Sequence, residues 1–206
     1  MVIDAFLSTA ATVSALLRSP LVAEKWDEPS VLPEFRVGPL AGHLARAVFT
    51  TEGYLTAEMP PGATMTDAVG YLSMLWTLTA QDNAQIVERG SVDAGTGQED
   101  LVARYDAAVA RLATALPALP EQRPMPMRAG LVLPLRDCLT TRLLELLVHA
   151  DDLALSLGVP TPDFDDEAAD LVVALLARFA RRRHGTPALL RAFTRAERAP
   201  SSVAAF

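Results

Sequence analysis

The chain has 206 residues, half of them hydrophobic, and its 18 basic and 25 acidic side chains give a net charge of −7. This length suits a single domain with its own core, and the negative charge disfavours a nucleic-acid partner. The single cysteine, Cys138, excludes an internal disulfide framework and a Cys-x-x-Cys site, so we expect a protein of the reducing cytoplasm.

The first half of the chain has the residue spacing of amphipathic helices. A first helix ending at residues 18–20 is predicted from apolar residues three or four apart, which are Ile3, Phe6, Ala10, Val13 and Leu17. After a loop with Pro29 and Pro33, a second helix is predicted from Pro39 to just before Met59. Its apolar stripe contains Leu40, His43, Leu44, Ala47 and Val48. No apolar run is long enough to cross a membrane, so we expect a soluble chain without a membrane partner.

The middle of the chain predicts two further helices. Thr64 and Asp67 have the spacing of a capping box, which predicts a third helix from there to Arg89, ended by the glycine-rich residues 90–97. A fourth helix is predicted over residues 101–116, because apolar residues recur at helical spacing until Pro117. In the proline-rich connection that follows, residues 130–133 predict a short extended piece.

A fifth helix is predicted from Pro134 to Leu157, with Gly158 as its cap. Residues 163–183 begin with acidic and end with basic side chains, which is the charge order that a helix dipole favours. We therefore predict an all-α fold in one domain, residues 1–206, with a core of roughly residues 1–158 and a helical extension over residues 159–206.

Polar residues form a stripe along the fifth predicted helix. They are Cys138, Arg142, Glu145, His149, Asp152 and Ser156. If this stripe faces the interior, Glu145 needs a compensating partner, because an unpaired carboxylate is costly to bury. Cys138 lies nearly two turns before Glu145, too far along a straight helix to bind the same ion.

Glu145 and His149 lie one helical turn apart, so their side chains share a face. The spacing alone fits either a local ion pair within a helical scaffold or two ligands of one ion. His43 on the second helix fits either a core histidine bonded to a carbonyl group or a third ligand. If the two helices face each other, the three residues supply an open metal site whose nitrogen-rich donor set favours zinc.

Three segments together resemble a known family. They are EFRVGPLAGHLARAV (34–48), TTRLLELLVHADDLALSLG (140–158) and TPALLRAFTRAERAPSSVAAF (186–206). They are similar to the metal-binding domain of mycothiol-dependent maleylpyruvate isomerases, one of the DinB-like helical bundles. The resemblance implies a four-helix core with a long crossover and a divalent metal bound by the residues that match the family's ligands, which are His43, Glu145 and His149.

The resemblance also implies a chemistry. A metal-bound thiol, mycothiol in this family, would be transferred to an electrophile or would assist an isomerisation. The characterised isomerases carry a separate carboxy-terminal domain, whereas 48 residues follow Gly158 here, so we do not expect maleylpyruvate itself as the substrate. A metal-dependent hydrolase and a non-catalytic metal or small-molecule binding bundle are the alternatives.

Three further polar residues lie near the proposed ligands in the sequence. Asp152, three residues after His149, could orient the imidazole ring, and Arg46 and Arg142, each one turn from a ligand, could hold an anionic substrate. Each of them could equally be solvated. The expected partners are thus a small-molecule thiol and its electrophile, and a homodimer is left open.

Overall fold

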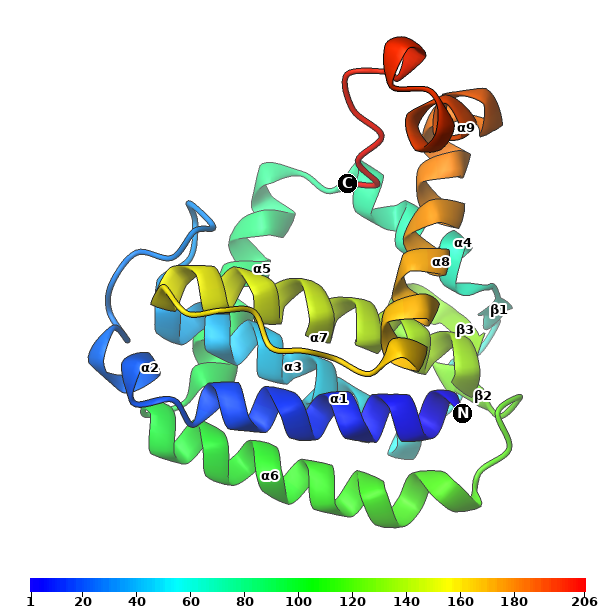
Figure 1. The fold of residues 1–206 in the computed structure, drawn as a ribbon. Helices are drawn as coiled ribbons and strands as arrows, with labels where there is room; N and C mark the ends of the chain where they lie inside the picture. The colour runs from blue at the N-terminus through cyan, green and yellow to red at the C-terminus, as the bar shows by residue number, and fades with distance from the viewer.

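A computed structural model describes all residues, 1–206, and its nine α-helices and one small sheet confirm the all-α class (Figure 1). The helices are α1 (Val2–Leu17), α2 (Pro20–Glu24), α3 (Val37–Thr56), α4 (Ala68–Leu72), α5 (Ala80–Ala94), α6 (Gln98–Ala115), α7 (Leu135–Leu157), α8 (Asp166–His184) and α9 (Thr186–Thr194). The strands are β1 (Thr64–Met65), β2 (Pro124–Pro126) and β3 (Leu131–Pro134). No helix combines the length and the apolarity that a membrane crossing requires.

Four long helices, α1, α3, α6 and α7, pack around one core. α1 and α7 run in one direction and α3 and α6 in the other (Figure 1). The start of α6 is fixed to the end of α1, because the Gln98 amide donates to the carbonyl oxygen of Leu17 at 2.7 Å. The chain crosses from α3 to α6 by way of β1, α4 and α5, which is the long crossover that the resemblance implied.

The apolar stripes predicted from the sequence are the faces that the core buries. Phe6 and Val13 of α1 and Leu40 and Leu44 of α3 are completely buried. Removal of such a side chain from water stabilises the fold by about 1.5–3 kcal/mol. Helix α7 ends as predicted at Leu157, with Gly158 in the left-handed conformation (φ 75°), and α8 has the predicted charge order, with Asp166 and Glu167 first and Arg181–His184 last.

The single helix predicted from Thr64 to Arg89 is wrong. Thr64 lies in β1, which pairs in parallel with β3, and Asp67 instead caps the short helix α4 by accepting a hydrogen bond from the Gly70 amide. After a 3-10 turn over Ser73–Thr77, a true capping box of Thr79 and Asp82 starts α5. The short extended piece expected at residues 130–133 is confirmed by β3.

Two glycines allow α3 and α5 to touch along their backbones. A Cβ atom on Gly42 would lie 2.2 Å from the carbonyl oxygen of Gly90, and one on Gly90 would lie 2.6 Å from the carbonyl oxygen of Pro39. No side chain fits at such distances, so α5 lies directly beside the turn of α3 that carries His43. The glycine-rich residues 90–97 were predicted to end this helix at Arg89. Gly90 instead lies inside α5, which continues to Ala94.

The residues after α9 return to the body of the molecule (Figure 1). The Trp76 indole N–H donates to the carbonyl oxygen of Ala205 at 3.1 Å, and the His184 ring lies 2.7 Å from the carbonyl oxygen of Ala204. The Phe206 ring packs 5.3 Å from that of Phe179, measured between centroids. Through Phe206, the tail contributes to the wall of a cavity that His43 also lines.

Candidate metal centre

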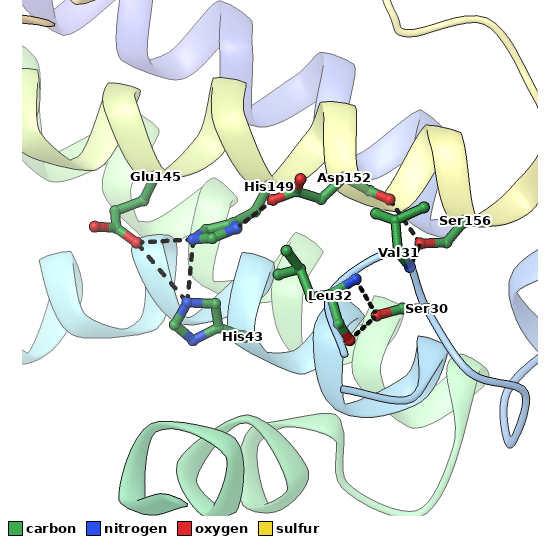
Figure 2. A network of polar contacts seen from close by, with 8 residues as sticks. All are labelled: Ser30, Val31, Leu32, His43, Glu145, His149, Asp152 and Ser156. Carbon is green, nitrogen blue, oxygen red and sulfur yellow. Dashed lines mark hydrogen bonds and ion pairs between the residues drawn. The ribbon is translucent and has the colours of Figure 1, made fainter. Parts of the chain in front are cut away.

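The structure brings the three predicted ligands together between α3 and α7 (Figure 2). His43 comes from α3, and Glu145 and His149 come from successive turns of α7, which packs antiparallel to it. The His43 and His149 Nε2 atoms are 3.2 Å apart. Glu145 Oε2 lies 3.3 Å from Nε2 of His149 and 3.9 Å from Nε2 of His43.

These separations fit one small cation. Three atoms so arranged share a point about 2.0 Å from each of them, and zinc bonds to imidazole nitrogen and carboxylate oxygen measure about 2.0–2.2 Å. The donor set of two imidazoles and one carboxylate is typical of sites that leave a position open for water or substrate. The spacing of the three side chains is therefore compatible with a bound divalent metal.

The second ring nitrogens of the two histidines differ in their surroundings. His149 Nδ1 lies 2.9 Å from Asp152 Oδ2, the carboxylate–histidine contact that fixes an imidazole with its Nε2 lone pair toward a metal (Figure 2). The role expected for Asp152 thus has the required geometry. His43 Nδ1 is buried without a hydrogen-bond partner, and its ring is held by packing against Phe35, 5.4 Å away between centroids.

The electrostatics of the metal-free site favour a positive charge at its centre. Burial, reinforced by the charge of His149, lowers the pKa of His43 to about 4. Burial acts in the same direction on His149, but the hydrogen bonds with Asp152 and Glu145 outweigh it and raise the pKa of His149 to about 9. Against the effect of burial, the hydrogen bond and charge of His149 lower the pKa of Glu145 to about 2. At neutral pH a proton on His149 therefore supplies the positive charge among the three.

The three side chains lie in the wall of a cavity of about 670 Å³, a size typical of small-molecule sites. Much of its lining is apolar or aromatic, and it includes Leu32, Phe35, Tyr54, Tyr71, Leu72, Met74, Leu75, Leu78, Ile86, Leu144, Val148 and Phe206. Its charged lining, besides the histidine pair, consists of Arg46, Arg89, Arg128, Arg142, Asp82, Glu145 and Asp152. The cavity therefore offers both apolar and charged surface to a bound small molecule.

The polar residues that the sequence analysis placed near the ligands differ in whether they line the cavity. Arg46 and Arg142 both line the cavity, but the Arg46 guanidinium is paired with Asp93 at 2.6 Å. Cys138 is fully buried outside the cavity, and burial raises the pKa of its thiol to about 11, so it is no nucleophile at neutral pH. The expectation that Cys138 lies too far from the site agrees with this placement.

Several cavity residues were not predicted from the sequence. Arg89 comes from α5, Arg128 from the turn before β3, and Phe206 from the tail. No local spacing relates them to His43 or Glu145, because tertiary packing alone brings them together. Tyr54 could have been found, since it lies on α3 eleven residues, about three turns, after His43.

Comparison with known proteins gives one match. The sequence model of the mycothiol maleylpyruvate isomerase N-terminal domain matches residues 7–154, a region that contains His43, Glu145 and His149. No curated protein and no solved structure matches the chain. Because the match covers well over half of its residues, the chain belongs to the family of the mycothiol maleylpyruvate isomerase N-terminal domain.

Proposed function

We propose that the protein is a divalent-metal-dependent enzyme that activates a low-molecular-weight thiol, mycothiol, for transfer to an electrophile or for thiol-assisted isomerisation. The observation that carries the proposal is the convergence of His43, Glu145 and His149 on one point in the wall of a cavity, in a chain of this family. A reducing cytoplasm, expected from the single cysteine, would keep such a thiol reduced.

His43, Glu145 and His149 would hold the metal, and the two imidazoles favour zinc. When bound, the ion supplies Lewis acidity that keeps a coordinated thiol in its nucleophilic thiolate form at neutral pH. With a metal bound, Asp152 would hold the remaining proton of His149 on Nδ1, so that the Nε2 lone pair would be directed at the ion. The apolar lining, with Leu144 and Val148 on α7, limits water around the reacting sulfur.

The proposed reaction needs no further reagent. In transfer to an activated alkene, a sulfur–carbon bond forms, the π bond of the alkene opens, and the proton lost by the thiol is regained at the adjacent carbon. In isomerisation the same addition is followed by rotation about the resulting single bond and by loss of the thiol, so that the thiol is regenerated. Both steps would take place in the cavity of about 670 Å³ that contains the three proposed ligands in its wall.

Metal analysis of the purified protein, residues 1–206, tests the ligand set. We expect close to one equivalent of zinc after equilibration with the ion, and its loss in His43→Ala and His149→Ala. His184→Ala is the matched control, because the third histidine lies at the end of α8, outside the cavity lining. Unchanged metal content in the first two variants would remove the proposed site.

Thiol conjugation tests the enzymatic part of the proposal. Metal-loaded protein with mycothiol and a panel of activated alkenes should form thioether faster than the chelator-treated protein does, and His149→Ala should reduce the rate to that of the metal-free control. Formation of conjugate at the uncatalysed rate across the panel, in protein shown to hold zinc, would instead identify a metal-binding module without catalysis.

A further inference from the structure

The cavity has a charge opposite in sign to that of the protein. Four arginines line it, against three carboxylates, in a chain whose net charge is −7. A divalent ion on the three proposed ligands would make the cavity still more positive. Like charges near Arg89, from Arg128 and Arg46, add to burial in lowering its pKa, so the arginines are near enough to repel one another.

The carboxylates of the cavity are engaged elsewhere. Asp82 completes the capping box of α5 with Thr79, Asp152 contacts His149, and Glu145 is one of the three proposed metal ligands. Of the arginines, Arg46 is neutralised by Asp93. Arg89, Arg128 and Arg142 form no ion pair in the protein, although the charges of Asp82 and Glu145 act on Arg89 and Arg142 respectively.

Arg142 is the most constrained of these arginines. Only 8% of its surface is exposed, and its one hydrogen bond, from Nε to the Thr141 hydroxyl group at 3.3 Å, involves no carboxylate. Arginine remains charged at all physiological pH values, so this charge is buried and lines the cavity without an ion pair. The nearby charge of Glu145 outweighs the effect of burial and raises the pKa of Arg142, but a metal bound by Glu145 would draw on that same carboxylate, and an anionic ligand could then take its place beside the guanidinium.

Two phenol groups line the same cavity. Tyr54 and Tyr71 form no side-chain hydrogen bond within the protein, although Tyr71 is buried. Burial, followed by the proximity of Tyr71, raises the pKa of Tyr54 to about 12, so its hydroxyl group stays protonated and can donate. A guanidinium with two free phenol donors suits an oxygen anion, since hydrogen bonds to a charged acceptor are the strong ones.

We propose that Arg142, assisted by Tyr54 and Tyr71, binds a carboxylate group of the electrophilic substrate beside the metal centre. Assignment of the carboxylate to the electrophile rests on the proposed function, whereas binding of a carboxylate at Arg142 does not. Arg142 lies one turn of α7 before Glu145, so an anchored carboxylate would place the rest of the substrate near the proposed thiol position. Neutral electrophiles would lack this anchor.

Benzoate and benzamide form a matched pair of probes, because they share a shape and differ in charge. Their binding is measured by calorimetry or ligand-detected NMR on the protein, residues 1–206, after removal of metal with a chelator, so that neither metal nor thiol contributes. We expect benzoate to bind at least about tenfold more tightly than benzamide, the factor that one charge-assisted interaction supplies. Equal affinities would overturn the proposal while leaving the metal and conjugation tests unaffected.

Variants then locate the carboxylate. Arg142→Met should weaken benzoate binding by at least about tenfold, whereas Arg46→Gln, whose arginine is already paired with Asp93, should change it less than about threefold. Thermal denaturation of the ligand-free Arg142→Met protein shows whether it is folded. Should it fail to fold, Arg142→Gln replaces it. Benzoate binding at the parent affinity in a folded Arg142 variant would refute the assignment.

Discussion

Removal of the charge on Asp152 should weaken metal binding without removing a ligand. In Asp152→Asn the amide has nearly the shape of the carboxylate, but the charged contact of 2.9 Å with His149 Nδ1 is lost. The amide can also donate to Nδ1, which would place the proton of the ring on Nε2, where the metal should bind. Loss of such a supporting carboxylate weakens metal binding by about 10- to 100-fold, or about 1.4–2.7 kcal/mol.

This loss is a net effect of two changes. Asp152 stabilises a divalent ion on His149, but it also stabilises the competing proton, since it raises the pKa of that ring. Because the ion carries twice the charge of the proton, the substitution should destabilise the bound ion more than it destabilises the competing proton. Competition with a chromogenic zinc chelator measures the change.

Asp151→Asn provides the control for this prediction. Asp151 is the exposed neighbour of Asp152 and bonds to the Thr161 hydroxyl group, away from the site. The reasoning would be refuted if Asp152→Asn bound zinc within about twofold of the parent protein, or if the Asp151 variant lost as much affinity.

Three further outcomes are expected. Gly42→Ala should lower the free energy of unfolding by about 3 kcal/mol, because its Cβ would lie 2.2 Å from the Gly90 carbonyl oxygen. Gly53→Ala, whose Cβ would meet nothing within 4 Å, should raise the free energy of unfolding by about 0.5–1 kcal/mol. Denaturant titrations compare the two variants. Zinc binding at pH 7 should release about one proton, because the pKa of His149 is about 9 without metal; calorimetry in two buffers measures this release. The zinc affinity should therefore fall as the pH falls below about 9. A zinc affinity that does not depend on pH would contradict this prediction. Chelation from a zinc concentration of 100 Kd should remove about 2.7 kcal/mol of stability and lower the Tm by about 5–10 °C; an unchanged Tm would argue against a bound ion.

The four core helices could be predicted because their apolar residues recur over four or more turns. The failure between residues 64 and 89 has a local cause. Thr64-x-x-Asp67 and Thr79-x-x-Asp82 have the same capping spacing, and only the second closes a capping box. Thr64 does not begin a helix, because it pairs with Leu131 in the sheet, a residue more than sixty positions away in the sequence. No proline or glycine marks the break before α5, at Leu78.

Some residues of the candidate site could likewise be predicted from local spacing, and others could not. Helical spacing alone puts Glu145, His149 and Asp152 on one face, so their mutual contacts could be predicted. His43 could be added only through the family resemblance, because nothing in one sequence shows that α3 and α7 face each other. The cavity residues Arg89 and Phe206 come from packing of α5 and of the tail, and they became visible only in the structure.

The geometry also bears on whether Glu145 and His149 merely pair within a scaffold. A local pair needs only these two residues, yet His43 Nε2 faces His149 Nε2 at 3.2 Å, with its Nδ1 left without a partner. Two imidazole nitrogens at this distance repel unless a cation or a proton lies between them. A proton can bond directly to only one nitrogen, whereas a divalent ion can bond both nitrogens and the Glu145 oxygen at ordinary bond lengths. The position of the second imidazole, buried with an unsatisfied nitrogen, therefore fits the proposed metal site better than it fits a local pair of Glu145 and His149.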